Sequence, residues 1–200
     1  MHVWQRGLCM NMNEARAVGP EADSRNLARI GILVVSDRAS RGEYKDQGGE
    51  AINRFLTEVV RSNWISILKI VPDGIDSVAD ALIEMSDKEN CDLVLTTGGT
   101  GPAPRDLTPE ATRSVITREL AGFGEQMRRV SLEQVPTAIL SRQTAGTRGR
   151  CLIVNLPGRP SSIGTCLNAV FPAIPYCLDL IGARPIEVNS DVCHAFRPKA

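Results

Sequence analysis

Short apolar runs alternate with amphipathic, helix-like segments along most of this 200-residue chain. A run that is apolar at nearly every position is typical of a strand buried on both faces of a parallel sheet. Parallel strands need long crossover connections, which are usually helices. The alternation therefore predicts an α/β protein, a three-layer α/β/α sandwich with a mainly parallel sheet. The predicted strands cover residues 30–35, 64–71, 93–97 and 151–156.

Apolar residues recur with helical spacing in the segments between these runs. The spacing predicts helices from residue 48, over 75–83, from 108 to 120, over 122–135 and over 161–181, the last interrupted at Pro172. At residue 108 a threonine suits the N-cap position, and Pro109 suits the first helical turn. Residues 145–150 contain a glycine and are expected to form a turn.

Polar residues with glycine or proline follow each predicted strand. Ligands of such folds bind outside the carboxyl ends of the strands, where the strand order reverses. If the strands are parallel, these loops meet at one edge of the sheet, and the sequence predicts one composite site there. The loops are residues 36–49, 72–74, 97–108 and 155–158.

The third loop carries the strongest functional signal, because residues 96–110 read Thr-Thr-Gly-Gly-Thr-Gly-Pro-Ala-Pro-Arg-Asp-Leu-Thr-Pro-Glu. Glycines let backbone N–H groups approach an anion closely. A Walker A loop would need a Lys after its last glycine, and a dinucleotide fingerprint would need glycine where Pro104 stands. Arg105 and Asp106 add a cation and a carboxylate, so the pattern indicates phosphate or nucleotide chemistry. A tight strand-to-helix turn without a ligand is the alternative.

Composition narrows the classes of function. Lys plus Arg and Asp plus Glu both number 23, so the basic excess expected of a broad nucleic-acid-binding surface is missing. The six cysteines form no C-x-x-C pair and His2 and His194 are the only histidines, which argues against a zinc site. No segment approaches about eighteen consecutive apolar residues, so we expect no membrane span.

The two ends of the chain differ from its centre. Residues 1–28 lack the apolar region of a secretory signal, so we expect a flexible extension in which Met10 or Met12 is an alternative start. Residues 29–182 form the predicted domain, and residues 183–200 form a tail with little periodicity. The cysteines in strand-like and helix-like runs are expected to be core residues in a reducing cytoplasm.

Several motifs occur in order between residues 29 and 182, and together they are specific. They are Ser36-Asp-Arg, Pro72-Asp, Thr97-Gly-Gly-Thr-Gly, Pro104-Arg-Asp-Leu-Thr-Pro-Glu-Ala, Gly122-Phe-Gly-Glu-Gln-Met-Arg, Leu140-Ser-Arg and Asn155-Leu-Pro-Gly-Arg-Pro. In these motifs the chain resembles the molybdopterin adenylyltransferases, the family that includes the G domain of gephyrin. The resemblance implies the MogA/MoaB-like fold and a trimeric, cytoplasmic enzyme of molybdenum cofactor biosynthesis.

Members of that family use Mg²⁺ to transfer AMP from ATP to the terminal phosphate of molybdopterin. The resemblance implies hand-over of the product to a molybdenum-insertion protein, and no nucleic-acid or membrane partner. The two acidic positions of the family map to Asp73 and Asp106, as catalytic residues and metal ligands. Its nucleotide-binding positions map to Gly98, Gly99, Thr100, Gly101, Pro157, Gly158 and Asp46, and its molybdopterin-binding positions to Ser36, Arg105, Ser141 and Asn155.

Residue chemistry supports this interpretation but leaves alternatives open. Two polyanions must meet, so charge neutralisation and positioning dominate catalysis. Asp73 and Asp106 suit Mg²⁺, and Arg105 or Arg142 suits a phosphate. Yet Asp73 could serve only a Pro-Asp-Gly turn, and Asp106 only a helix cap. A non-catalytic molybdopterin-binding domain is the second hypothesis, and an unrelated nucleotide-binding protein is a weaker third.

Overall fold

The computed structural model describes residues 26–198. The expected N-terminal extension and its alternative start sites lie almost wholly outside these residues. The strands are β1 (Ala28–Val35), β2 (Trp64–Val71), β3 (Leu93–Thr97), β4 (Arg118–Glu119), β5 (Ala145–Arg148) and β6 (Cys151–Leu156). The helices are α1 (Asp37–Ser40), α2 (Gly48–Val59), α3 (Ile75–Ile83), η2 (Glu84–Lys88), α4 (Thr108–Val115), α5 (Ala121–Leu132), η3 (Pro136–Leu140), α6 (Pro160–Val170), η4 (Phe171–Ala173) and α7 (Ile174–Leu180).

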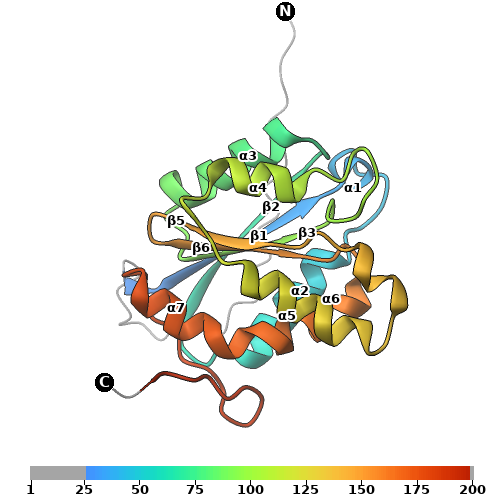
Figure 1. Ribbon diagram of the computed structural model, residues 1–200. Helices are drawn as coiled ribbons and strands as arrows, with labels where there is room; N and C mark the ends of the chain where they lie inside the picture. Colours follow the sequence, from blue (N-terminus) through green and yellow to red (C-terminus); the bar gives the residue numbers. More distant parts are fainter. Residues whose placement is uncertain (1–25, 199–200) are drawn as a thin grey trace, which may run out of the picture.

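The strands form one six-stranded sheet in the order β2-β1-β3-β6-β5-β4. The first four are parallel to one another, whereas β5 pairs antiparallel with both β6 and β4. Helices α2, α5, α6 and α7 cover one face of the sheet, and α3 and α4 cover the other (Figure 1). The predicted three-layer sandwich with a mainly parallel sheet is therefore confirmed.

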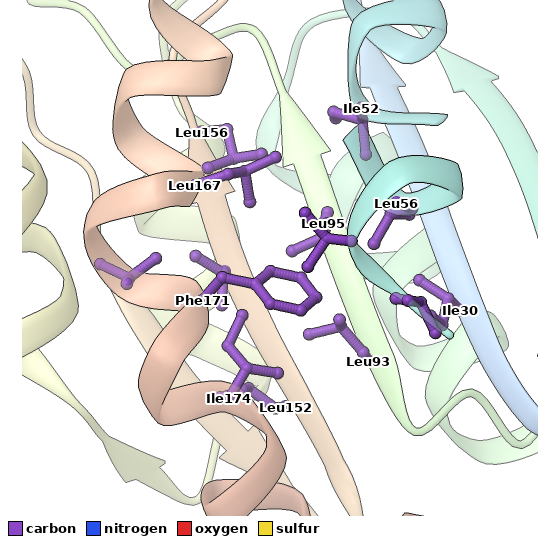
Figure 2. Close-up of a cluster of buried hydrophobic side chains, with 14 of the residues drawn as sticks. Ile30, Ile52, Leu56, Leu93, Leu95, Leu152, Leu156, Leu167, Phe171 and Ile174 are labelled. Carbon is purple, nitrogen blue, oxygen red and sulfur yellow. The ribbon is translucent and has the colours of Figure 1, made fainter. Parts of the chain in front are cut away.

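The central strands are apolar along their whole length because a hydrophobic core covers each face of the sheet. Ile30 and Ile32 of β1 belong to the larger cluster, while Leu33 and Val35 belong to the cluster under α3 and α4. In the larger cluster, Phe171 lies between the helices and the sheet (Figure 2). Burying a large apolar side chain of this kind contributes about 1.5–3 kcal/mol, so these two clusters dominate the stability of the fold.

The edge formed by β4 and β5 differs from the sequence-based expectation. Helix α4 ends at Val115, not near residue 120, and Ile116 is extended. The helical prediction was wrong because β-branched residues at 115–117 favour an extended chain, and residues 118–119 pair with β5. The expected turn at 145–150 is mostly strand β5. Gly146 permits the pairing, since a Cβ there would lie 2.6 Å from the carbonyl oxygen of Arg118.

The segment after residue 182 packs against the domain despite its weak periodicity. Ile186 and Cys193 join the core, and Val188 bridges Val60. The buried carboxylate of Asp92 accepts hydrogen bonds from the backbone and guanidinium of Arg184 at 2.9 and 2.8 Å. Periodicity misses such a segment because its anchors are isolated contacts.

Other expectations about the interior can be checked directly. Among the described cysteines, four are buried and Cys177 is half-buried, which fits the prediction of core thiols. The predicted break near Pro172 is the short 3-10 helix η4 between α6 and α7. Together, Pro160–Leu180 is long and apolar enough to cross a membrane by length and mean hydropathy alone, at 1.3. Phe171 and Ile174 of this stretch belong to the core (Figure 2), as does Leu178.

Candidate functional site

The loops after β1 and β3 leave the sheet at the place where its strand order reverses. From β1 the chain crosses to β2 on one side and later returns to β3 on the other. Neighbouring strands of opposite crossover direction leave a crevice at their carboxyl ends. The predicted composite edge therefore exists, and the loops after β2 and β6 adjoin it through the contacts described below.

The glycine loop, residues 98–101, has a backbone that only glycine can adopt easily. Gly98 has φ 103° and Gly99 has φ 63°. A Cβ on Gly98 would lie 2.1 Å from the carbonyl oxygen of Val35, and one on Gly99 would lie 2.3 Å from Oγ1 of Thr108. The loop is thus pressed against β1 and the start of α4, which leaves its other side for a ligand.

Thr108 holds this loop in a way that differs from the prediction. The N-cap of α4 is Leu107, and Thr108 is the first helical residue. Its hydroxyl donates to the carbonyl of Gly98 at 2.9 Å, and its backbone N–H donates to the carbonyl of Gly99 at 3.0 Å. The capping prediction was wrong because the threonine side chain satisfies the glycine loop instead of the helix.

Arg142 fixes the far end of the loop. Its backbone N–H donates to the carbonyl of Thr100 at 2.9 Å, and its Nε donates to the carbonyl of Gly101 at 2.8 Å. The rest of the guanidinium contacts the Glu110 carboxylate and the Asp106 carbonyl. Arg142 is therefore a clamp that joins the glycine loop, α4 and the chain before β5.

Asp37, Asp73 and Arg105 form a second cluster that joins the loops after β1, β2 and β3. The Asp37 N–H donates to Oδ2 of Asp73 at 2.8 Å, and the Asp73 N–H donates to Oδ1 of Asp37 at 3.1 Å. Arg105 donates from Nε and Nη2 to the two Asp37 oxygens at 2.9 Å each. The bond from Arg105 is the main reason that the pKa of Asp37 lies below its usual value.

Asp106 lies directly after Arg105 and next to the glycine loop. Its Oδ2 accepts a hydrogen bond from the Ala103 N–H at 3.0 Å, and a Cβ on Gly101 would lie 2.7 Å from that oxygen. Asp73 likewise uses Oδ2 for a backbone bond. Within the described residues, neither Oδ1 atom accepts a hydrogen bond, so each carboxylate keeps one oxygen available.

This donor set fits Mg²⁺, which takes one or two carboxylates together with phosphate oxygens and waters. Over residues 26–198, no group of three or more His, Cys, Asp and Glu side chains could hold a metal ion. Any Mg²⁺ at Asp73 and Asp106 would therefore depend on the phosphates of a bound substrate for its other ligands.

The loop after β6 completes the floor of the crevice. A Cβ on Gly158 would lie 3.3 Å from the Cα of Gly98, and the Pro157 carbonyl accepts a bond from Oγ1 of Thr97 at 2.9 Å. The structure thus brings Pro157 and Gly158 against the glycine loop.

Asp46, Ser36 and Asn155 mainly support their surroundings in this structure. The Asp46 carboxylate accepts from the N–H groups of Gly48 and Gly49 at 3.0 and 2.6 Å, at the start of α2. Ser36 caps α1 through the Ala39 N–H. Asn155 is fully buried in β6, and its amide donates to the hydroxyls of Thr96 and Thr112 at 3.1 and 2.9 Å.

Ser141 lies in a pocket of about 310 Å³ beside the antiparallel strands. Its hydroxyl donates to Oε1 of Gln143 at 2.6 Å. We call this cavity the arginine pocket, because guanidinium groups from three parts of the chain line it. Its lining is Arg113, Glu119, Ala121, Arg128, Ser141, Arg142, Gln143 and Thr144.

The side chains in this pocket are already tied to one another. Arg128 donates to the carbonyl of Gln143 at 2.8 Å. Glu119 accepts from Thr144 at 2.8 Å and from Arg113 at 3.0 Å, and these bonds hold its pKa below the usual value. Arg142 lines this pocket and also binds carbonyl groups of the glycine loop, so the arginine pocket and the loop are adjacent.

Sequence reasoning missed Asp37, Glu110 and most of the arginine pocket as parts of the site. Asp37 stood inside a quoted motif, and its place at the end of a buried strand was an available signal. Arg113 and Arg128 lie on ordinary amphipathic helices, and only the tertiary fold brings them together.

Comparisons with known proteins agree with this geometry. The profile of the family described as "Probable molybdopterin binding domain" matches residues 31–176. A molybdopterin adenylyltransferase from Helicobacter pylori strain J99 is 56% identical over 170 residues, covering 85% of this chain and 97% of the relative. That from Escherichia coli strain K12 is 45% identical over 187 residues, covering 88% and 96%.

Solved structures extend the similarity to the fold. The molybdopterin biosynthesis enzyme MoaB from Thermus thermophilus superimposes with a TM-score of 0.73 and 44% identity, covering 80% of this chain and 100% of that one. The region matched by the family profile contains every loop of the candidate site. With this profile match and these relatives, the chain belongs to the molybdopterin adenylyltransferase family.

Proposed function

We propose that this protein is a molybdopterin adenylyltransferase, which transfers AMP from Mg-ATP to the terminal phosphate of molybdopterin. The observation that carries the proposal is the juxtaposition of two unlike halves. Arg105 bonds to the Asp73 carbonyl and directly precedes Asp106, and Arg142, which lines the arginine pocket, clamps the glycine loop beside which Asp106 lies. The names of relatives 45–56% identical to this chain support the same reaction.

The chemistry needs no protein nucleophile. An oxygen of the molybdopterin phosphate forms a bond to the α-phosphorus of ATP, and the bond from that phosphorus to the oxygen bridging to the β-phosphorus breaks. The electron pair leaves with pyrophosphate, so atoms and charge balance without water or an oxidant. Positioning and charge neutralisation supply most of the catalysis in such transfers.

In this proposal, the glycine loop and the Pro157-Gly158 turn bind the nucleotide. Backbone N–H groups of Gly98–Gly101 face the phosphates, and Asp46 supports this side by holding the start of α2. Asp73 and Asp106 hold Mg²⁺, which supplies charge neutralisation on the triphosphate when bound. Arg105 lies beside them at the edge where the two substrates meet.

The arginine pocket and Ser141 receive molybdopterin. Guanidinium groups recognise phosphate through planar pairs of donors, so Arg113 and Arg128 suit the terminal phosphate. Ser36 directly precedes Asp37, the partner of Arg105, and its hydroxyl lies 3.5 Å from that of Tyr44. Asn155 contributes indirectly, because its bonds to Thr96 and Thr112 hold β6, β3 and α4 together.

The proposal includes a homotrimer in the cytoplasm that hands its product to a molybdenum-insertion protein. Exposed apolar residues support self-association: Ile139 is 69% and Leu140 53% exposed on η3. An apolar pocket of about 320 Å³, lined by Leu120, Phe123 and Val170 among others, offers a complementary surface. The mass in solution, measured by light scattering, tests this part: a monomeric mass contradicts it.

The function is tested by mixing the purified protein with molybdopterin and Mg-ATP and measuring pyrophosphate. We expect release that depends on both substrates and on Mg²⁺. Asp106→Asn should slow release by about a hundredfold to a thousandfold and keep molybdopterin binding. Tight binding of molybdopterin without any pyrophosphate from the wild type would overturn the transferase and leave a binding domain.

A further inference from the structure

We propose that Asp37 is a positioning residue of the transferase: it holds Arg105 away from the Asp73 carboxylate and fixes that carboxylate for metal binding. The inference rests on the proposed function. It adds a residue that was assigned to neither the nucleotide-binding nor the molybdopterin-binding residues. It follows from the contacts of one side chain with three strand-end loops.

Asp37 occupies the centre of these contacts. Its Oδ1 accepts from the Asp73 N–H at 3.1 Å and from Nη2 of Arg105 at 2.9 Å, and its Oδ2 accepts from Nε of Arg105 at 2.9 Å. Its own N–H donates to Oδ2 of Asp73 at 2.8 Å. Asp37 and Asp73 therefore hold each other reciprocally, and neither can rotate without breaking a bond to the other.

The ion pair between Arg105 and Asp37 does little for stability. The Arg105 side chain is 66% exposed and that of Asp37 27%, and ion pairs as exposed as this contribute little to folding. A bidentate pair does, however, fix the direction of both groups. The main effect of this ion pair is therefore to orient the side chains at the loop that carries Asp73.

Arg105 would otherwise have a competing partner. Its Nη2 already donates to the backbone carbonyl of Asp73 at 3.0 Å, so the Asp73 carboxylate is within a short side-chain rotation. An arginine bound there would occupy the oxygens that Mg²⁺ needs. Because both Asp37 oxygens hold the guanidinium, Oδ1 of Asp73 stays free for a metal.

The test compares Asp37→Asn with Asp76→Asn, an exposed acid in the first turn of α3 that removes the same charge. We expect Asp37→Asn to lower kcat by about tenfold to a hundredfold, the range caused by small misplacements of catalytic groups. Its affinity for Mg-ATP, measured by calorimetry without molybdopterin, should fall. Its molybdopterin affinity and thermal midpoint should match those of Asp76→Asn.

A double variant tests whether Asp37 acts through Arg105. If Asp37 acts through Arg105, Arg105→Gln combined with Asp37→Asn should be no slower than the slower single variant, because coupled residues are non-additive. Multiplied losses would overturn the inference. So would unchanged kcat in Asp37→Asn, or a loss of molybdopterin binding and thermal stability in parallel with kcat. Absence of pyrophosphate release from the wild type would instead overturn the proposed function.

Discussion

The two halves of the site are built from opposite charges and in opposite ways. On the carboxylate side, Asp37 and Asp73 each lie two residues after the end of a parallel strand, and Asp106 lies in the loop after β3. Backbone N–H groups hold oxygens of all three carboxylates. In the arginine pocket, the cations come from α4, α5 and the chain before β5, and they line the antiparallel edge of the sheet. One half is suited to a metal and a triphosphate, the other to a phosphorylated partner.

This difference between the two halves explains how a chain without net charge can bind two polyanionic substrates. Net charge is zero, yet acids outnumber the single Arg105 in the cluster of Asp37, Asp73 and Asp106, whereas three arginines outnumber the single Glu119 in the arginine pocket. Arg142 is the link between the halves, because it binds the loop carbonyls and also lines the arginine pocket. The comparison predicts that variants in one half will disturb one substrate and spare the other.

The largest effect is expected from Asp106→Asn. The amide keeps the size of the side chain but removes the negative charge beside the glycine loop. Losing one such preorganised electrostatic group costs about a hundredfold to a thousandfold in kcat. Pyrophosphate release in single-turnover experiments measures it, and equal thermal midpoints show that the fold is intact. Wild-type turnover in this variant would remove Asp106 from the chemistry.

Gly98→Ala should destabilise the glycine loop, which connects the two halves of the site. Its φ of 103° strains any other residue, and the added Cβ would meet the Val35 carbonyl at 2.1 Å. Strain of this kind costs about 1–3 kcal/mol in the free energy of unfolding, which urea denaturation measures.

Gly164→Ala is the matched control, because Gly164 lies inside α6 and a Cβ there meets nothing within 4 Å. This change should raise the free energy of unfolding by about 0.5–1 kcal/mol. If both alanines behave alike, the glycine loop is not held against β1 as described.

Arg113→Gln tests the role of the arginine pocket in binding molybdopterin. Arg113 lines the arginine pocket and is paired only with Glu119 among described residues. A charged hydrogen bond contributes about 1.5–3 kcal/mol, so the Kd for molybdopterin should rise by about tenfold or more. Arg129→Gln on the exposed side of α5 should leave that Kd unchanged. An equal rise in both variants would mean that net charge matters and the pocket does not.

The smallest effect concerns thiols far from both halves. Burial raises the pKa of Cys91 and of Cys151 to about 12, so both stay protonated in the folded protein at neutral pH. The unfolded thiols ionise near their usual pKa of about 8.5, so this contribution to stability is complete below that pH and is lost as pH rises toward 12. Mass spectrometry after iodoacetamide treatment should find these two cysteines unmodified in the native protein at pH 8. Modification without unfolding would contradict their burial.

Much of this architecture was predictable from local pattern. The central strands were predicted because each is apolar along its length, and the glycine loop was predicted because it directly follows such a strand. Asp73 and Asp106 were predicted as site residues because the family resemblance mapped its two acidic positions onto them. The β4–β5 edge was missed because its strands are short, and they depend on pairing of β4 with β5 and of β5 with β6. The second role of Arg142, the reciprocal bonds of Asp37 and the burial of Asn155 arise only from contacts between loops distant in sequence.

The most direct test of two opposed halves is a calorimetric titration of each substrate separately into the wild type, Asp73→Asn and Arg113→Gln. We predict that Asp73→Asn weakens binding of Mg-ATP and leaves the molybdopterin Kd within about twofold, the range of neutral substitutions. Arg113→Gln should do the reverse. If either variant weakens both substrates equally, or if the pattern is exchanged, the division of the site into a carboxylate side and an arginine pocket is wrong.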